Sequence, residues 1–98
     1  PVMAYNLPGA LEKFADVAEA MGECVEGLPL REAAYLAVDA VEALIDDCGI
    51  TSSIRDFGVK EEDFPSLADV AMTVARPLEN NPRKMTKEEM IAIYAQAF

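Results

Sequence analysis

The sequence predicts an all-α fold, a compact bundle of about five helices around a buried central helix. Apolar residues recur at steps of three and four along most of the chain, and no segment alternates with a period of two over a useful length. Glycine and proline separate the periodic segments at short intervals. The chain has 98 residues, of which 52% are hydrophobic and 27% charged, as is typical of one globular domain. We therefore expect residues 1–98 to form a single helical domain.

The first segments are a short apolar piece and an amphipathic helix. Pro1 to Asn6 has no helix start signal before it, and Asn6 to Gly9 is expected to be a turn. A helix is predicted from about Ala10 to Met21, ended by Gly22. Its apolar face follows the spacing of a helix and comprises Leu11, Phe14, Ala15, Ala18 and Met21.

The central helix is predicted from Leu30 to about Cys48. Its polar positions form one narrow stripe, which comprises Tyr35, Asp39, Glu42 and Asp46. The other positions are largely apolar, whereas a surface helix shows the reverse balance. We therefore expect this helix to be buried on most sides, with the other helices around it. Gly49 follows the last periodic residue and is suited to the left-handed conformation that ends a helix.

The second half of the chain begins with a corner at residues 50–59. Thr51 or Ser52 is expected to cap a single helical turn there, and Gly58 to close it. The apolar residues of the corner are expected to point inward as anchors: Ile50, Ile54, Phe57 and Val59. Lys60 to Asp63 is a charged turn.

Two further helices are predicted after this turn. Pro65 suits the first turn of one of them, and Pro77 is expected to kink or stop it near its end. Its expected buried face comprises Leu67, Val70, Ala71, Val74 and Leu78. A loop follows at Asn80 to Arg83, and Thr86 with Glu89 then forms the capping box of a last helix. Met90, Ile93, Tyr94 and Ala97 are expected to face inward on it.

Charge and composition exclude several classes of function. The formal net charge of -10 argues against nucleic acid and anionic membranes as partners, because both would repel the chain. Histidine is absent, which removes histidine acid–base chemistry and the usual transition-metal sites. Cys24 and Cys48 are in no CxxC arrangement and are expected to be reduced, small apolar fillers.

The sequence gives no sign of a membrane segment or a leader. The longest uncharged run, Pro1 to Leu11, is too short to span a bilayer and is interrupted by Pro8 and Gly9. No basic region precedes an apolar block, as it would in a signal peptide. We therefore expect a soluble cytoplasmic domain.

No catalytic, cofactor-binding or metal-binding residue is assigned from these patterns. The acidic groups Asp46-Asp47 and Glu61-Glu62-Asp63 are at helix ends or turns, where solvated charge is ordinary, and match no calcium loop. The glycines form no phosphate-binding loop. Arg76 and Arg83 flank the Asn- and Pro-rich loop and could contact phosphate or carboxylate, but we favour contacts with helix-end carbonyls or acidic neighbours.

Several segments together resemble the C-terminal helical region of the iron-containing (group III) alcohol dehydrogenases. The matching pieces, in order, are Val2-Met3-Ala4-Tyr5-Asn6, the helix Lys13 to Gly22, Cys48-Gly49-Ile50, the corner Ile54 to Val59, Asp63 with Leu67-Ala68 and Ala71-Met72, Asn80-Asn81-Pro82-Arg83, Thr86, and Ile93-Tyr94. Two departures are visible. Pro1 directly precedes Val2, where the family commonly has an intervening histidine, and Arg76-Pro77-Leu78 stands where the family often has Arg-Leu-Leu.

The resemblance implies that the chain is part of an oxidoreductase that transfers hydride between an alcohol and a nicotinamide cofactor. Members of the family have an N-terminal α/β domain that binds NAD or NADP and a C-terminal all-helical domain. One metal ion between them, iron or sometimes zinc, is held by an aspartate and three histidines upstream of the segment that matches Val2. None of these ligands is present here, so the isolated 98 residues are expected to bind no metal or nucleotide and to be inactive.

Two hypotheses follow about the role and the partners of the chain. In the first, it walls the active-site cleft of an alcohol dehydrogenase, with the upstream nucleotide-binding domain of the same chain as partner. In the second, it is a free-standing acidic helical module for protein interactions. For the isolated chain we also expect a homodimer, through apolar side chains that the upstream helices would otherwise cover: Met3, Tyr5, Leu7, Ile91 and Phe98.

Overall fold

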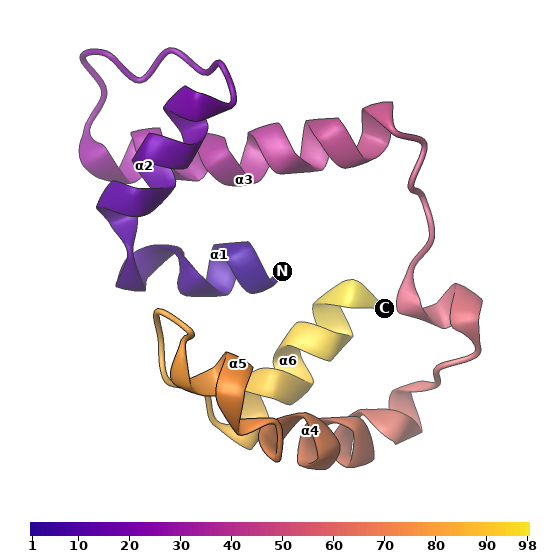
Figure 1. Cartoon of the computed structure of the whole chain (residues 1–98). Helices are drawn as coiled ribbons and strands as arrows, with labels where there is room; N and C mark the ends of the chain where they lie inside the picture. Colours follow the sequence, from indigo (N-terminus) through magenta and orange to yellow (C-terminus); the bar gives the residue numbers. More distant parts are fainter. The chain divides into compact units, whose positions relative to one another are not determined.

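The computed structural model describes all 98 residues, and they form helices, turns and loops without a β-strand. This confirms the predicted all-α fold, with six α-helices instead of about five (Figure 1). The residues form two units, an N-terminal unit at Met3–Thr51 and a C-terminal unit at Ser52–Phe98 that also includes Pro1–Val2.

The N-terminal unit is a pair of packed helices preceded by a short helical segment. Helix α1 (Val2–Asn6) continues into the 3₁₀ turn η1 (Leu7–Gly9), and α2 (Leu11–Ala20) follows. The loop after α2 leads to α3 (Leu30–Asp47), the predicted central helix, with Cys48 as its C-cap. Gly49 has a φ of 71°, so the left-handed conformation predicted for it is confirmed.

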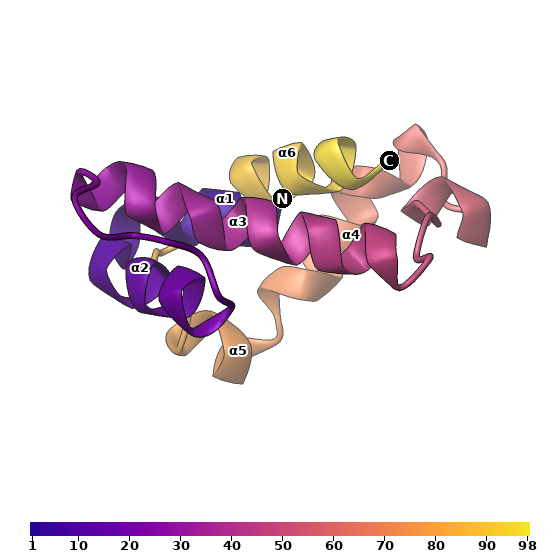
Figure 2. The same ribbon diagram turned by 90° about the horizontal axis from the view of Figure 1, so that it is seen from above.

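Helix α2 packs against the first half of α3, as Figures 1 and 2 both show. The contact is made by small side chains, and the buried residues of the two helices are Ala18, Ala33, Ala34 and Ala37. Alanine allows two helix backbones to approach closely, because no long side chain separates them.

The burial predicted for most sides of α3 is wrong. No residue of α3 after Ala37 is buried, and every residue from Glu42 to Ile50 is exposed. Periodicity predicts which side of a helix is apolar, but burial also needs a neighbouring element that is long enough to cover it.

Leu7, in η1, is the largest side chain that is fully buried, although we expected it to be uncovered.

The corner at residues 50–59 forms a 3₁₀ turn, η2 (Ile54–Phe57), and is anchored less than predicted. Its N-cap is Ser53, not Thr51 or Ser52, and the Ser53 N–H donates to Asp56 Oδ2 at 2.7 Å. Gly58 closes the turn with a φ of 86°, as predicted. Ile50 and Phe57 do not point inward, since they are 59% and 79% exposed.

Pro77 divides the helix predicted after Pro65 into two. Helix α4 (Phe64–Met72) ends before Thr73, and α5 (Ala75–Glu79) is separate. In one continuous helix the ring of Pro77 would clash with the carbonyl of Thr73, four residues earlier. In α5 the proline lies in the first turn, where an N–H has no partner within the helix.

Helix α6 (Lys87–Ala97) packs against α4 and completes the C-terminal unit (Figure 1). Its predicted capping box is confirmed: the Glu89 N–H donates to Thr86 Oγ1 at 3.3 Å, and the Thr86 N–H donates to Glu89 Oε2 at 2.8 Å. The buried residues of this unit are Phe64, Ala68 and Ile93. The predicted face of α4 is therefore only partly right, because Val70 and Val74 are exposed while Leu67 and Ala71 are half-buried.

An aromatic cluster joins η2, α4 and the end of α6. Phe98 meets Phe64 edge-on with ring centroids 5.4 Å apart, and Tyr94 stacks on Phe64 at 6.4 Å. The guanidinium carbon of Arg55 lies 4.0 Å from the centroid of the Phe98 ring. These contacts bring the exposed corner and the last residue of the chain together.

Candidate functional site

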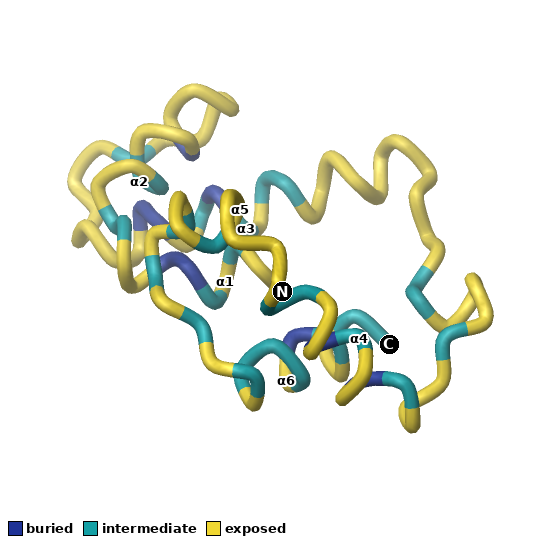
Figure 3. Tube along the Cα trace, turned by 60° about the horizontal axis from the view of Figure 1, so that its bottom comes forward, coloured by how far each residue is buried: buried dark blue, intermediate teal, exposed yellow.

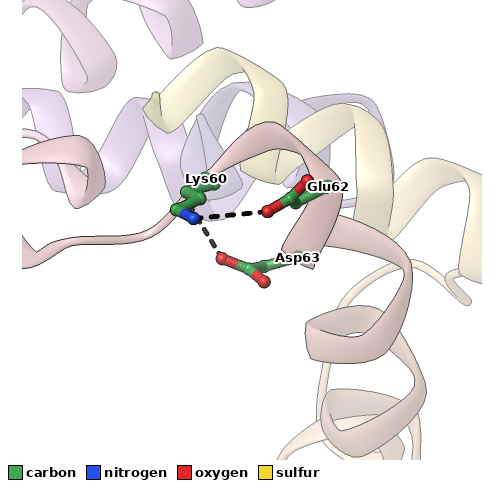
Figure 4. Close-up of polar contacts among 3 residues, drawn as sticks. All are labelled: Lys60, Glu62 and Asp63. Carbon is green, nitrogen blue, oxygen red and sulfur yellow. Dashed lines mark hydrogen bonds and ion pairs between the residues drawn. The ribbon is translucent and has the colours of Figure 1, made fainter.

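The acidic turn at Glu61-Glu62-Asp63 forms the local structure before α4. The Lys60 N–H donates to Asp63 Oδ2 at 2.9 Å, and Lys60 Nζ is 3.4 Å from Glu62 Oε1 (Figure 4). The Ser66 hydroxyl donates to the carbonyl of Asp63 at 2.8 Å. The exposed Lys60–Glu62 ion pair contributes only about 0–1 kcal/mol to stability. The hydrogen bonds of Asp63 hold the turn that precedes α4, and we see no chemical role for its carboxylates.

Asp46 and Asp47 lie in the last turn of α3, and both are exposed. No basic residue lies in that turn. The C-terminal end of a helix carries a partial negative charge, so two carboxylates there are unfavourably placed. No group of three or more His, Cys, Asp or Glu side chains in the chain could hold a metal ion.

The loop after α5 is closed by asparagine side chains. Asn80 Nδ2 donates to the carbonyl of Arg76 at 2.8 Å, and Asn81 Nδ2 donates to the carbonyl of Arg83. The contacts expected for the arginine side chains, with helix-end carbonyls or acidic neighbours, stay a prediction, and the two bonds described here come from the asparagines. A better clue in the sequence was the pair of asparagines, whose short amide side chains commonly bond to nearby backbone groups.

An open pocket of about 630 Å³ lies beside this loop, and we did not predict it. Apolar side chains form most of its wall and charged or amide groups complete it; the lining comprises Met72, Ala75, Leu78, Glu79, Asn81, Pro82, Lys84 and Met85. It contains no cysteine or histidine nucleophile. Its chemistry suits apolar contact more than proton transfer.

The cysteines are free, and both are exposed. They are therefore not the buried apolar fillers that we expected. Cys24 lies in the loop between α2 and α3, and Cys48 caps the end of α3.

None of the helices combines the length and the apolar composition that a membrane-spanning helix requires.

The uncovered apolar residues are not those that we expected. Leu7 is fully buried, and the other four residues of the expected flank are half-buried: Met3, Tyr5, Ile91 and Phe98. Large exposed aliphatic side chains occur instead at Leu44, Ile45 and Ile50, beyond the part of α3 that α2 covers. The uncovered end of α3 could have been expected from the sequence, because the periodic segment at 10–21 is shorter than the one at 30–48.

The chain is similar to known dehydrogenases over nearly its whole length. It is 46% identical to the 1,3-propanediol dehydrogenase of Citrobacter freundii and 43% identical to the lactaldehyde reductase of Escherichia coli K12, in each case over 99% of this chain and 25% of the relative. It therefore spans about a quarter of the length of these curated relatives.

Solved structures agree with these relatives. The fold matches a crystal structure of a 1,3-propanediol oxidoreductase with a TM-score of 0.93 and 46% identity, over 99% of this chain and 25% of the other. It matches an alcohol dehydrogenase from Oenococcus oeni with a TM-score of 0.88 and 41% identity, over 99% of this chain and 26% of the other. The sequence model for the C-terminal region of the Fe-containing alcohol dehydrogenase family matches residues 1–98. The chain therefore belongs to the Fe-containing alcohol dehydrogenase family and corresponds to the family's C-terminal region.

Proposed function

We propose that this chain is the helical C-terminal domain of a larger, two-domain, iron-dependent alcohol dehydrogenase. The whole enzyme would transfer hydride between an alcohol and NAD or NADP, and this domain would wall the active-site cleft. The observation that carries the proposal is the family match over all 98 residues. A further relative, 38% identical over 96 residues, is an NAD-dependent methanol dehydrogenase from Bacillus methanolicus.

The catalytic groups of the enzyme would come from the part of the protein that precedes this chain. The residues present do not fit an iron or zinc site, because histidine is absent and no cluster of acidic or cysteine side chains could hold a metal. They also include no glycine-rich loop for the phosphates of a nucleotide. We therefore assign no catalytic, cofactor-binding or metal-binding residue to this chain, and its contribution is an apolar, water-excluding wall.

The proposal also includes the cellular location of the protein and the oligomeric state of the isolated chain. Two exposed free cysteines are suited to the reducing environment of the cytoplasm, where we place the protein. A homodimer of the isolated chain stays a prediction, although one residue of the flank on which it rested, Leu7, is buried and the other four are half-buried. Sedimentation of the isolated chain over a range of concentrations tests it.

A chimeric enzyme tests the proposed function. This chain would replace the matching quarter of the 1,3-propanediol dehydrogenase of Citrobacter freundii, to which it is 46% identical. We expect NAD-linked oxidation of 1,3-propanediol in the presence of ferrous iron. The same dehydrogenase without that quarter, and the isolated chain, should both be inactive.

Two results would contradict the proposal. One is a folded chimera that binds iron and NAD but has no more activity than the truncated dehydrogenase. The other is a start codon directly before position 1 in the coding sequence, which would support a free-standing interaction module. An open reading frame that continues upstream through a glycine-rich loop and a histidine cluster would support the dehydrogenase.

A further inference from the structure

Helix α3 is longer than the helix that covers it. Helix α2 has 10 residues and α3 has 18, which at 1.5 Å per residue are about 15 Å and 27 Å long. One helix can therefore cover little more than half of the other. The burial pattern agrees, since the buried residues of α3 are Ala33, Ala34 and Ala37, all in its first half.

The uncovered half of α3 presents an apolar stripe. We define the α3 end surface as Val41, Leu44, Ile45, Cys48 and Ile50. The first four follow the spacing of one helix face, and Leu44, Ile45 and Ile50 are 52%, 39% and 59% exposed. Figure 3 shows the end of α3 as a continuous exposed stretch. Single exposed apolar residues are ordinary, but a contiguous stripe marks a contact surface.

Charges around this stripe indicate the chemistry of its occupant. Exposed carboxylates border it on either side, at Glu42 and Asp47, while helical spacing places Asp39 and Asp46 on the opposite face of α3. The negative end of the α3 dipole adds to their field, and no basic residue in the last turn offsets it. A partner with lysine or arginine beside its apolar residues would relieve this repulsion. A second copy of the chain, with a net charge of -10, would increase it.

We propose that the α3 end surface docks a helix that has an apolar stripe flanked by basic residues. This inference rests on the proposed function, because the helix would come from the preceding part of the dehydrogenase. Its packing would continue the α2–α3 contact along the same helix. The relatives are about four times as long as this chain, so the remaining polypeptide is long enough to supply such a helix.

The two exposed cysteines allow a direct test with an internal control. Cys48 belongs to the α3 end surface, whereas Cys24 lies in the loop at the other end of the helix. Alkylation by N-ethylmaleimide would be followed at each cysteine by peptide mass spectrometry, in the isolated chain and in the Citrobacter chimera. We expect Cys48 to react at least about tenfold more slowly in the chimera, while Cys24 changes by less than about twofold.

Matched variants of the chimera locate the contact. Leu44→Lys on the α3 end surface should return Cys48 to the reaction rate of the isolated chain. Val17→Lys, at a position of α2 that is 40% exposed, should not. Asp47→Lys, at a carboxylate that borders the surface, should weaken the protection, and Asp16→Lys on α2 should leave it unchanged.

Three results would overturn the inference. An active chimera in which Cys48 reacts as fast as in the isolated chain would refute the docking but leave the proposed function intact. An inactive chimera with a reactive Cys48 would refute both. Protection of Cys48 in the isolated chain would assign the surface to a second copy if it depends on concentration, and to another part of the same chain if it does not.

Discussion

Replacement of Phe98 by leucine tests the aromatic cluster in the C-terminal unit. The ring of Phe98 has the Arg55 guanidinium on its face at 4.0 Å and Phe64 edge-on at 5.4 Å. Leucine keeps much of the apolar volume but has no π-system, so Phe98→Leu removes both interactions while disturbing the packing little.

The size of the effect follows from these two contacts. A cation–π pair at a partly exposed site contributes about 0.5–1 kcal/mol. An aromatic pair contributes about 0.5–1.5 kcal/mol beyond the area it buries. Phe98→Leu should therefore lower the free energy of unfolding by about 1–2.5 kcal/mol.

Urea unfolding followed by far-UV circular dichroism measures this change, and Phe57→Leu is the matched control. Phe57 lies in the same corner as Arg55 but is 79% exposed, so its replacement should change stability by less than about 0.5 kcal/mol. A double-mutant cycle with Arg55→Met isolates the cation–π term, for which we expect a coupling of about 0.5–1 kcal/mol. Equal stabilities of the two leucine variants would refute the reasoning, because the ring contacts would then contribute nothing.

Three other expected results concern the last helix, the corner and the absent metal ligands. Thr86→Ala removes the acceptor of the Glu89 N–H and should lower the free energy of unfolding by about 0.5–2 kcal/mol. An unchanged midpoint of urea unfolding would mean that α6 does not depend on this cap. Gly58→Ala forces a φ of 86° on a residue with a Cβ and should cost about 1–2 kcal/mol, whereas Gly9→Ala, at a glycine without positive φ, is the control for loss of a glycine. The isolated chain should show no stoichiometric, sub-micromolar binding of ferrous iron or zinc in a calorimetric titration, and no NAD-linked alcohol oxidation.

The four longer helices could be predicted from the sequence because their signals are local, whereas the short α1 and the separate α5 were not predicted as helices. Gly49 ends α3 through its own backbone freedom, and Thr86 with Glu89 starts α6 through bonds within four residues. Such features depend on neighbours in the chain, which the sequence gives directly. The effect of Pro77 was only partly predicted, because the choice between a kink and a complete break depends on where the next helix can begin.

Burial was predicted less well because it depends on elements that are distant in the sequence. Leu44 and Phe57 were expected inside, and Leu7 outside, from apolar character and position alone. Each assignment needed the lengths and contacts of other elements. The candidate site shows the same limit: the residues alone excluded a metal centre, and only the resemblance to a family indicated that the chemistry belongs to another part of the enzyme.

The alanine contact between α2 and α3 restricts how this domain can vary during evolution. Ala18, Ala34 and Ala37 are fully buried where the two helices meet. Because protein interiors are closely packed, we expect a larger side chain at any of them to push the helix axes apart. Glycine, serine or cysteine would change the volume far less. We therefore expect drift at these positions to remain among small residues, while the aliphatic side chains at the uncovered end of α3 vary together with whatever they contact.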